Sequence, residues 1–64
     1  MKKLTERQVR SWHWNRLVNE WYDLQRLVGH FGVEDWRDLP PFYRWNAEVL
    51  YNEINSRGQT AFDY

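Results

Sequence analysis

The alternation of hydrophobic and polar positions predicts a long first helix over residues 5–28. Thr5 is followed three residues later by Gln8, which matches a capping box, and neither Gly nor Pro occurs before Gly29. Hydrophobic residues recur in this stretch at spacings of three and four and therefore share one helical face: Trp14, Leu17, Trp21, Leu24 and Val28. Such a face needs an apolar partner, so we expect a second helix to cover it.

That second helix is predicted over residues 41–57. Pro40 and Pro41 favour its start, because Pro is tolerated in a first helical turn, and Gly58 favours its end. Its main apolar stripe consists of Tyr43, Ala47, Leu50 and Ile54. A second apolar stripe, offset by roughly 100° around the helix, consists of Phe42, Trp45 and Val49. The second helix thus has two apolar faces, although a two-helix hairpin buries only one.

These elements predict an all-α fold, a two-helix antiparallel hairpin within one small domain, residues 1–64. The connector, residues 29–40, has Gly and Pro at its boundaries and enough apolar residues for one short helical turn near residues 33–38. The tail, residues 58–64, is too short for an element of its own. The expected core consists of Trp14, Leu17, Trp21, Leu24, Tyr43, Ala47, Leu50 and Ile54, with Trp36 closing its loop end. Two copies could pair into a four-helix bundle.

Composition favours a folded protein whose stability depends on association. The chain has no Cys but carries five Trp, four Tyr and three Phe, and a domain of about 60 residues buries only about 60% of its unfolded surface. Self-association or binding to a larger protein would supply the missing burial. No apolar run approaches the roughly 20 residues that cross a bilayer, and residues 1–7 are too charged for a signal segment. We therefore expect a cytoplasmic protein, in a host cell if the source is a phage, with no membrane partner.

The second stripe and Trp12 are the candidate binding residues. Phe42, Trp45 and Val49 must be covered by the protein itself, through Trp36 and Phe62, or by a partner. Trp12 is predicted on the water-facing side of the first helix, and an exposed Trp favours a binding role. Arg16, four residues later, could instead stack on the Trp12 ring. We expect the partner-binding anchors to be Trp12, Arg16, Phe42, Trp45 and Val49.

Basic residues of the first helix add an electrostatic rim to this site. Residues 1–30 hold six Lys and Arg against three Asp and Glu, and residues 31–64 hold the reverse. The segment with Arg7, Arg10, Trp12, His13, Trp14 and Arg16 interleaves basic and aromatic residues, a combination that can bind single-stranded nucleic acid. The pI of about 6.7 does not favour nucleic acid as the partner. A basic rim that meets an acidic protein surface is the preferred interpretation.

Enzymatic and metal chemistry are not indicated. His13 and His30 have no Cys nucleophile and no arrangement with Ser, and two helices enclose no pocket easily. Glu34, Asp35 and Asp38 match neither a calcium loop nor a zinc signature. The two carboxylates Glu34 and Asp35 are better explained as first-turn residues of the short helix. We expect no catalytic residue, no metal and no cofactor.

The sequence therefore predicts a non-enzymatic protein-binding module. Its small size and Trp-rich helices resemble the small accessory proteins with which phages and mobile elements inhibit or redirect host machinery. On that resemblance it would bind and inhibit or modulate a larger intracellular protein. A structural, self-assembling component of a virion or other large complex is the alternative, and a nucleic-acid-binding regulator is the third.

Overall fold

The fold is built only from helices over the residues described, 3–58, in a computed structural model of the chain. Helix α1 spans Glu6–Arg10 and α2 spans Trp14–Phe31. A short 3-10 helix, η1, spans Trp36–Asp38, and α3 spans Pro41–Ser56. The all-helical class is confirmed, and no strand occurs among these residues. None of the helices in the described part is both long enough and apolar enough to span a bilayer.

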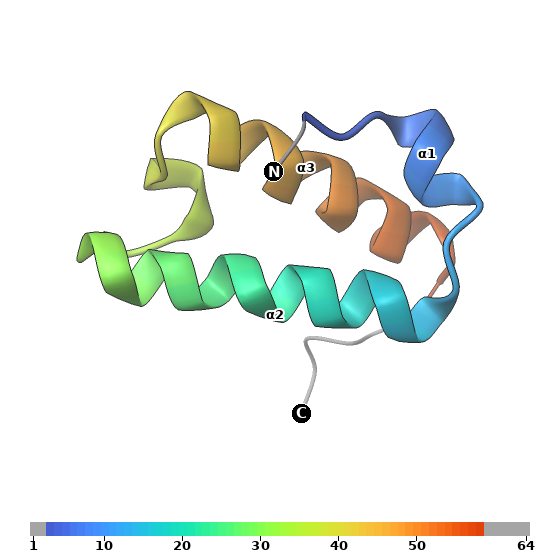
Figure 1. The fold of residues 1–64 in the computed structure, drawn as a ribbon, viewed down its shortest axis with the longest axis horizontal. Coiled ribbons are helices and arrows are strands. Elements are labelled where there is room, and N and C mark those ends of the chain that lie inside the picture. The colour runs from blue at the N-terminus through green and yellow to red at the C-terminus, as the bar shows by residue number, and fades with distance from the viewer. Residues whose placement is uncertain (1–2, 59–64) are drawn as a thin grey trace.

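Helices α2 and α3 form the main packing layer. They lie side by side in Figure 1 and run in opposite directions, and η1 packs against both at the end where the chain turns. The predicted stripes meet at this interface, where the fully buried side chains include Leu17, Leu24, Leu50 and Ile54. Trp21 and Trp36 meet edge to face with their rings 5.9 Å apart, and Tyr51 lies against both. Trp36 therefore closes the loop end of the core, as predicted.

Helix α1 covers a second side of α3. Figure 1 shows α1 and the segment before it beside α3, with α2 on the other side of α3 in that view. Val9 of α1 is fully buried, and Val49 of α3 is only 6% exposed. The second apolar stripe of α3 is thus covered in part by the protein's own N-terminal residues, and Trp36, expected there, lies instead in the α2–α3 core.

The prediction of one helix over residues 5–28 is wrong, because the chain breaks between α1 and α2. The capping box of Thr5 and Gln8 is present, but α1 ends after five residues at Ser11. The Ser11 hydroxyl donates to the Gln8 carbonyl oxygen at 2.9 Å, and the Trp12 amide bonds to Val9 with the tighter three-residue spacing. The chain then enters α2 through His13 in an extended conformation.

Arg57 provides the tertiary reason for this break. Its Nη2 lies 3.2 Å, 3.3 Å and 2.8 Å from the carbonyl oxygens of Val9, Arg10 and Trp12. The last carbonyls of a helix have no partner within the helix. An arginine from the end of α3 supplies partners here, so a long-range contact replaces the hydrogen bonds of a continuous helix.

The end of α2 also differs from the prediction. The helix continues through Gly29 and ends at Gly32, which has a left-handed φ of 69°. Only glycine adopts this conformation without steric cost, which explains the stop. The predicted helical turn near residues 33–38 is present as η1, and the second helix begins at Pro41 as expected. The predicted docking of Phe62 and Tyr64 lies outside the described residues.

The predicted core is largely confirmed. Trp14 and Tyr43, expected in the core, are only half-buried. Buried residues that the expected core did not include are Val9, Leu39, Asn46 and Val49. Val9 and Val49 extend the core to α1 and Leu39 extends it to the connector, which the two-helix hairpin did not anticipate.

Candidate partner-binding surface

Two neighbouring residues of α3 fix the N-terminal strap, which we define as residues 3–5. The Leu4 amide donates to Asn46 Oδ1 at 2.7 Å, and Trp45 Nε1 donates to the Leu4 carbonyl oxygen at 2.7 Å. Asn46 is fully buried, so its amide group must be satisfied inside the protein. The first bond helps to satisfy it, as expected for a buried Asn, and the second fixes the orientation of the Trp45 indole. Sequence periodicity gave no indication of this clamp.

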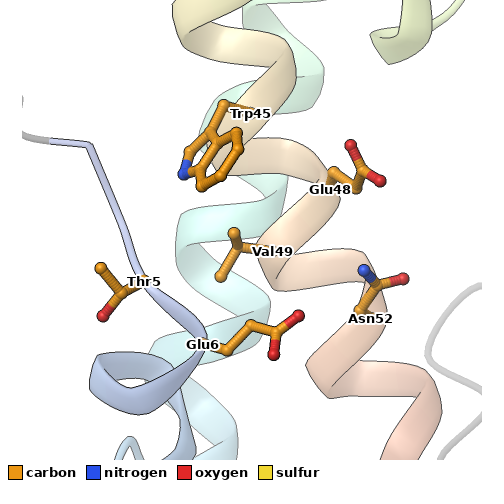
Figure 2. Close-up of a pocket in the computed structure, with 6 residues that line it drawn as sticks. All are labelled: Thr5, Glu6, Trp45, Glu48, Val49 and Asn52. Atoms are coloured by element: carbon orange, nitrogen blue, oxygen red, sulfur yellow. The ribbon is translucent and has the colours of Figure 1, made fainter.

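A groove runs between the strap and α3. It has a volume of about 330 Å³ and is lined by Thr5, Glu6, Trp45, Glu48, Val49 and Asn52. Figure 2 shows Thr5 and Glu6 on the blue N-terminal side and the other four lining residues on α3, with Val49 between Trp45 and Glu6 and with Glu48 on the side of α3 away from Thr5. We call this the α1–α3 groove. It combines one aromatic side chain, one buried aliphatic side chain and two carboxylates.

Trp45 also lines a second hollow, which lies next to the groove. Lys3, Pro41, Phe42, Arg44 and Glu48 complete its lining, and its volume is about 430 Å³. The Lys3 ammonium lies 4.2 Å from the centroid of the Trp45 ring, within cation–π range. Trp45 and Glu48 line both hollows, which therefore adjoin along α3.

Exposed aromatic rings extend from these two hollows toward the connector. The aromatic surface, as we define it, consists of Phe31, Phe42, Tyr43 and Trp45. Phe31 is 43% exposed, Phe42 37% and Trp45 45%. The Tyr43 ring centroid lies 5.6 Å from that of Phe31 and 5.4 Å from that of Phe42, so aromatic contacts join α2 to α3 here. Of the predicted second stripe, Phe42 and Trp45 reach this surface, whereas Val49 forms the floor of the groove.

The structure places Trp12 differently from the prediction. It lies in the turn between α1 and α2, where it is half-buried and packs against the core. The Arg16 guanidinium lies 3.9 Å from its ring centroid, which is the stacked arrangement considered from the sequence. The expectation of a water-facing Trp assumed an unbroken helix, and the break at Ser11 removes that assumption. Neither Trp12 nor Arg16 lines the α1–α3 groove.

Arg7 and Arg10 are exposed on α1, near the groove rather than within it. Arg10 lines a neighbouring hollow together with Glu6, Asn52 and Glu53. Within residues 3–58, neither guanidinium forms an ion pair. Arg16, by contrast, is on another helix and is stacked on Trp12. The basic segment seen in the sequence is therefore divided between two differently oriented elements.

The acidic connector serves the short helix. Asp35 precedes η1, and its carboxylate accepts from the Arg37 amide at 3.3 Å and pairs with the Arg37 guanidinium at 3.0 Å. Asp35 therefore caps the short helix from the position before it, whereas the sequence predicted Glu34 and Asp35 within its first turn. In the portion of the chain that is described, no three His, Asp or Glu side chains converge as they would around a metal ion.

Comparison with known proteins adds no relative from which a function could be transferred. No family model matches the chain, and neither a curated protein nor a solved structure matches it. The candidate site therefore depends on geometry alone. Sequence patterns found Phe42, Trp45 and Val49 but missed Lys3, Glu6 and Glu48, because the site forms only when the N-terminal residues fold against α3.

Proposed function

We propose that this protein is a non-enzymatic protein-binding module that contacts its partner through the aromatic surface and the adjoining α1–α3 groove. In this proposal it acts on a larger intracellular protein, which it inhibits or modulates, as the small phage-type accessory proteins that it resembles do. Phe42 and Trp45 are the anchors, and Val49 supports Trp45 from the groove floor. Arg7 and Arg10 form the rim, whereas Trp12 and Arg16 act by holding the turn between α1 and α2.

The observation that carries the proposal is the exposure of Trp45 in a fixed orientation. A Trp held by a hydrogen bond to Leu4 loses little conformational freedom on binding, although 45% of its surface remains exposed. Trp and Tyr dominate the binding energy of protein interfaces, where a few central aromatic residues cost most when truncated. Phe42 and Phe31 extend the apolar area around it.

The test compares three variants in affinity capture from the lysate of a candidate bacterial host after nuclease treatment. Phe42→Ala and Trp45→Ala should lose a protein that the unaltered chain recovers in stoichiometric amount. Tyr22→Ala is the matched control, because Tyr22 is also 45% exposed but lies on α2 outside the site. Equal recovery by all three variants would contradict the proposal, provided that circular dichroism shows unchanged helix content.

Self-assembly is the second candidate, and the same exposed rings favour it. Phe31, on α2, and Phe42, on α3, are both large and apolar, so two copies could bury them against each other. Pairing into a four-helix bundle, or docking within a virion, would use this surface. Light scattering should then give a mass that rises with concentration and falls to that of one chain in Phe42→Ala. A mass that stays at that of one chain would contradict self-assembly. Of the two candidate functions, only the protein-binding module would then stand.

A further inference from the structure

Two carboxylates line the α1–α3 groove, and neither has a cationic partner among residues 3–58. Glu6 comes from the first turn of α1 and Glu48 from the exposed side of α3, and both line the groove. Among residues 3–58 neither forms an ion pair or a side-chain hydrogen bond. The nearby Glu53 does have a cationic partner, because its Oε2 accepts a hydrogen bond from Arg57 Nε at 2.8 Å. A partner that covered the groove with apolar groups alone would bury two unpaired charges, which is costly.

The remaining lining suits the rest of a basic side chain. Val49 is an aliphatic floor that a methylene stem can cover, and Trp45 is an aromatic wall beside it (Figure 2). An arginine stem packs on apolar surface while its guanidinium remains at the polar edge. The guanidinium also stacks on aromatic faces and donates to carboxylates from several directions.

The chain already places an arginine over two of its other indoles. Arg16 lies 3.9 Å from the Trp12 ring centroid, and Arg37 lies 4.5 Å from that of Trp36. Trp45 has Lys3 at 4.2 Å, and Lys3 belongs to the adjoining hollow and not to the groove lining. The groove side of the indole is therefore free of a cation from the described residues.

We propose that the α1–α3 groove binds an arginine side chain of the partner protein, with the stem on Val49, the guanidinium against Trp45, and Glu6 and Glu48 as its carboxylate partners. This inference rests on the proposed binding function and specifies the chemistry that its partner presents. Five donors in a planar fork match two carboxylates that come from different helices, whereas lysine offers a compact charge with no flat face.

The experiment selects peptides that bind the intact protein from a library of random dodecapeptides displayed on phage. Selected peptides should be enriched in arginine, and changing that arginine to citrulline, which removes the charge, should weaken binding by about tenfold or more. The Glu6→Gln/Glu48→Gln variant should weaken binding by a similar factor. The matched control is Glu34→Gln/Asp38→Asn, which removes the same charge outside the groove and should bind like the unaltered protein.

The outcomes separate this inference from the proposed function. Peptides whose binding is lost in Trp45→Ala but that contain no essential arginine would overturn the inference and leave the binding function standing. A selection without any Trp45-dependent peptide would overturn both. If the unaltered protein forms dimers that dissociate in Glu6→Gln/Glu48→Gln, the arginine would come from a second copy, and the assignment to a different protein would be wrong.

Discussion

The two sides of α3 are held by different kinds of interaction. Toward α2, buried side chains such as Leu17, Leu24 and Leu50 pack together with an aromatic cluster around Trp21. Toward α1, Val9 and Val49 are the buried apolar residues of the described chain, and polar contacts from Asn46, Trp45 and Arg57 to main-chain atoms hold the N-terminal residues in place. The α2 side buries most of the apolar core, and the α1 side fixes the position of the N-terminal residues.

This difference accompanies the groove on the α1 side. The α2 side buries large apolar side chains and is therefore suited to stability, although a hollow of about 310 Å³ lined in part by Leu24 and Leu50 also opens there. Hydrogen bonds to a strap instead keep main-chain atoms at a fixed distance and leave room between the helices, where Glu6, Glu48 and Val49 line a groove. The groove of the proposed binding surface thus lies beside the stable side and outside its apolar core.

The largest expected effect comes from breaking the α2 side. Leu50→Ala should destabilise the protein by about 2 to 5 kcal/mol, because the fully buried leucine leaves a cavity. A chain of this length has a free energy of unfolding of only about 3 to 10 kcal/mol, so much of the population should unfold. Urea denaturation followed by circular dichroism measures the change. Tyr22→Ala, an exposed control, should shift the unfolding free energy by less than about 0.5 kcal/mol, and an equal loss in both would contradict this assignment of the core.

Breaking the α1 side should have a smaller and local effect. Arg57→Ala removes the donors to three carbonyl oxygens and the 2.8 Å pair with Glu53, which should cost about 1 to 2 kcal/mol. Amide hydrogen exchange should accelerate in α1, while the amides of Leu24 and Leu50 stay protected. Arg26→Ala is the control, since its 3.4 Å pair with Asp23 is exposed and should contribute little. Uniform acceleration over all helices would show that the two sides unfold together.

The same comparison shows what the sequence could predict. The α2 side follows from hydrophobic spacing, so the stripe containing Leu17 and Leu24 and the start of α3 at Pro41 were predicted correctly. The α1 side depends on contacts between residues more than 40 positions apart, such as Leu4 with Asn46 and Arg57 with Trp12. No local pattern encodes these contacts. Consequently Trp12 was placed on the wrong kind of surface, and Glu6 and Glu48 were not recognised as groove residues.

The smallest expected effect concerns the end of helix α2. Alanine substitutions at its two glycines should change the free energy of unfolding in opposite directions. A Cβ added at Gly29 meets nothing within 4 Å, and Gly29 lies within a helix, so Gly29→Ala should stabilise the protein by about 0.5 to 1 kcal/mol. Gly32 has equal space but a φ of 69°, so Gly32→Ala should destabilise it by about 1 kcal/mol. Midpoints of urea denaturation measure both changes.

The directions of these two stability changes show where α2 ends, and therefore how α2 contributes to the proposed binding surface. If α2 ended at Gly29, as the sequence pattern predicted, that glycine would hold the left-handed conformation and Gly29→Ala would be the destabilising change. With the stop at Gly32, the last turn of α2 brings Phe31 to 5.6 Å from Tyr43, ring centroid to ring centroid, and so joins α2 to the aromatic surface. Gly32→Ala should therefore also weaken a partner that contacts Phe31, whereas Gly29→Ala should leave its binding unchanged. Loss of binding in Gly29→Ala alone would place the end of α2, and with it Phe31, elsewhere.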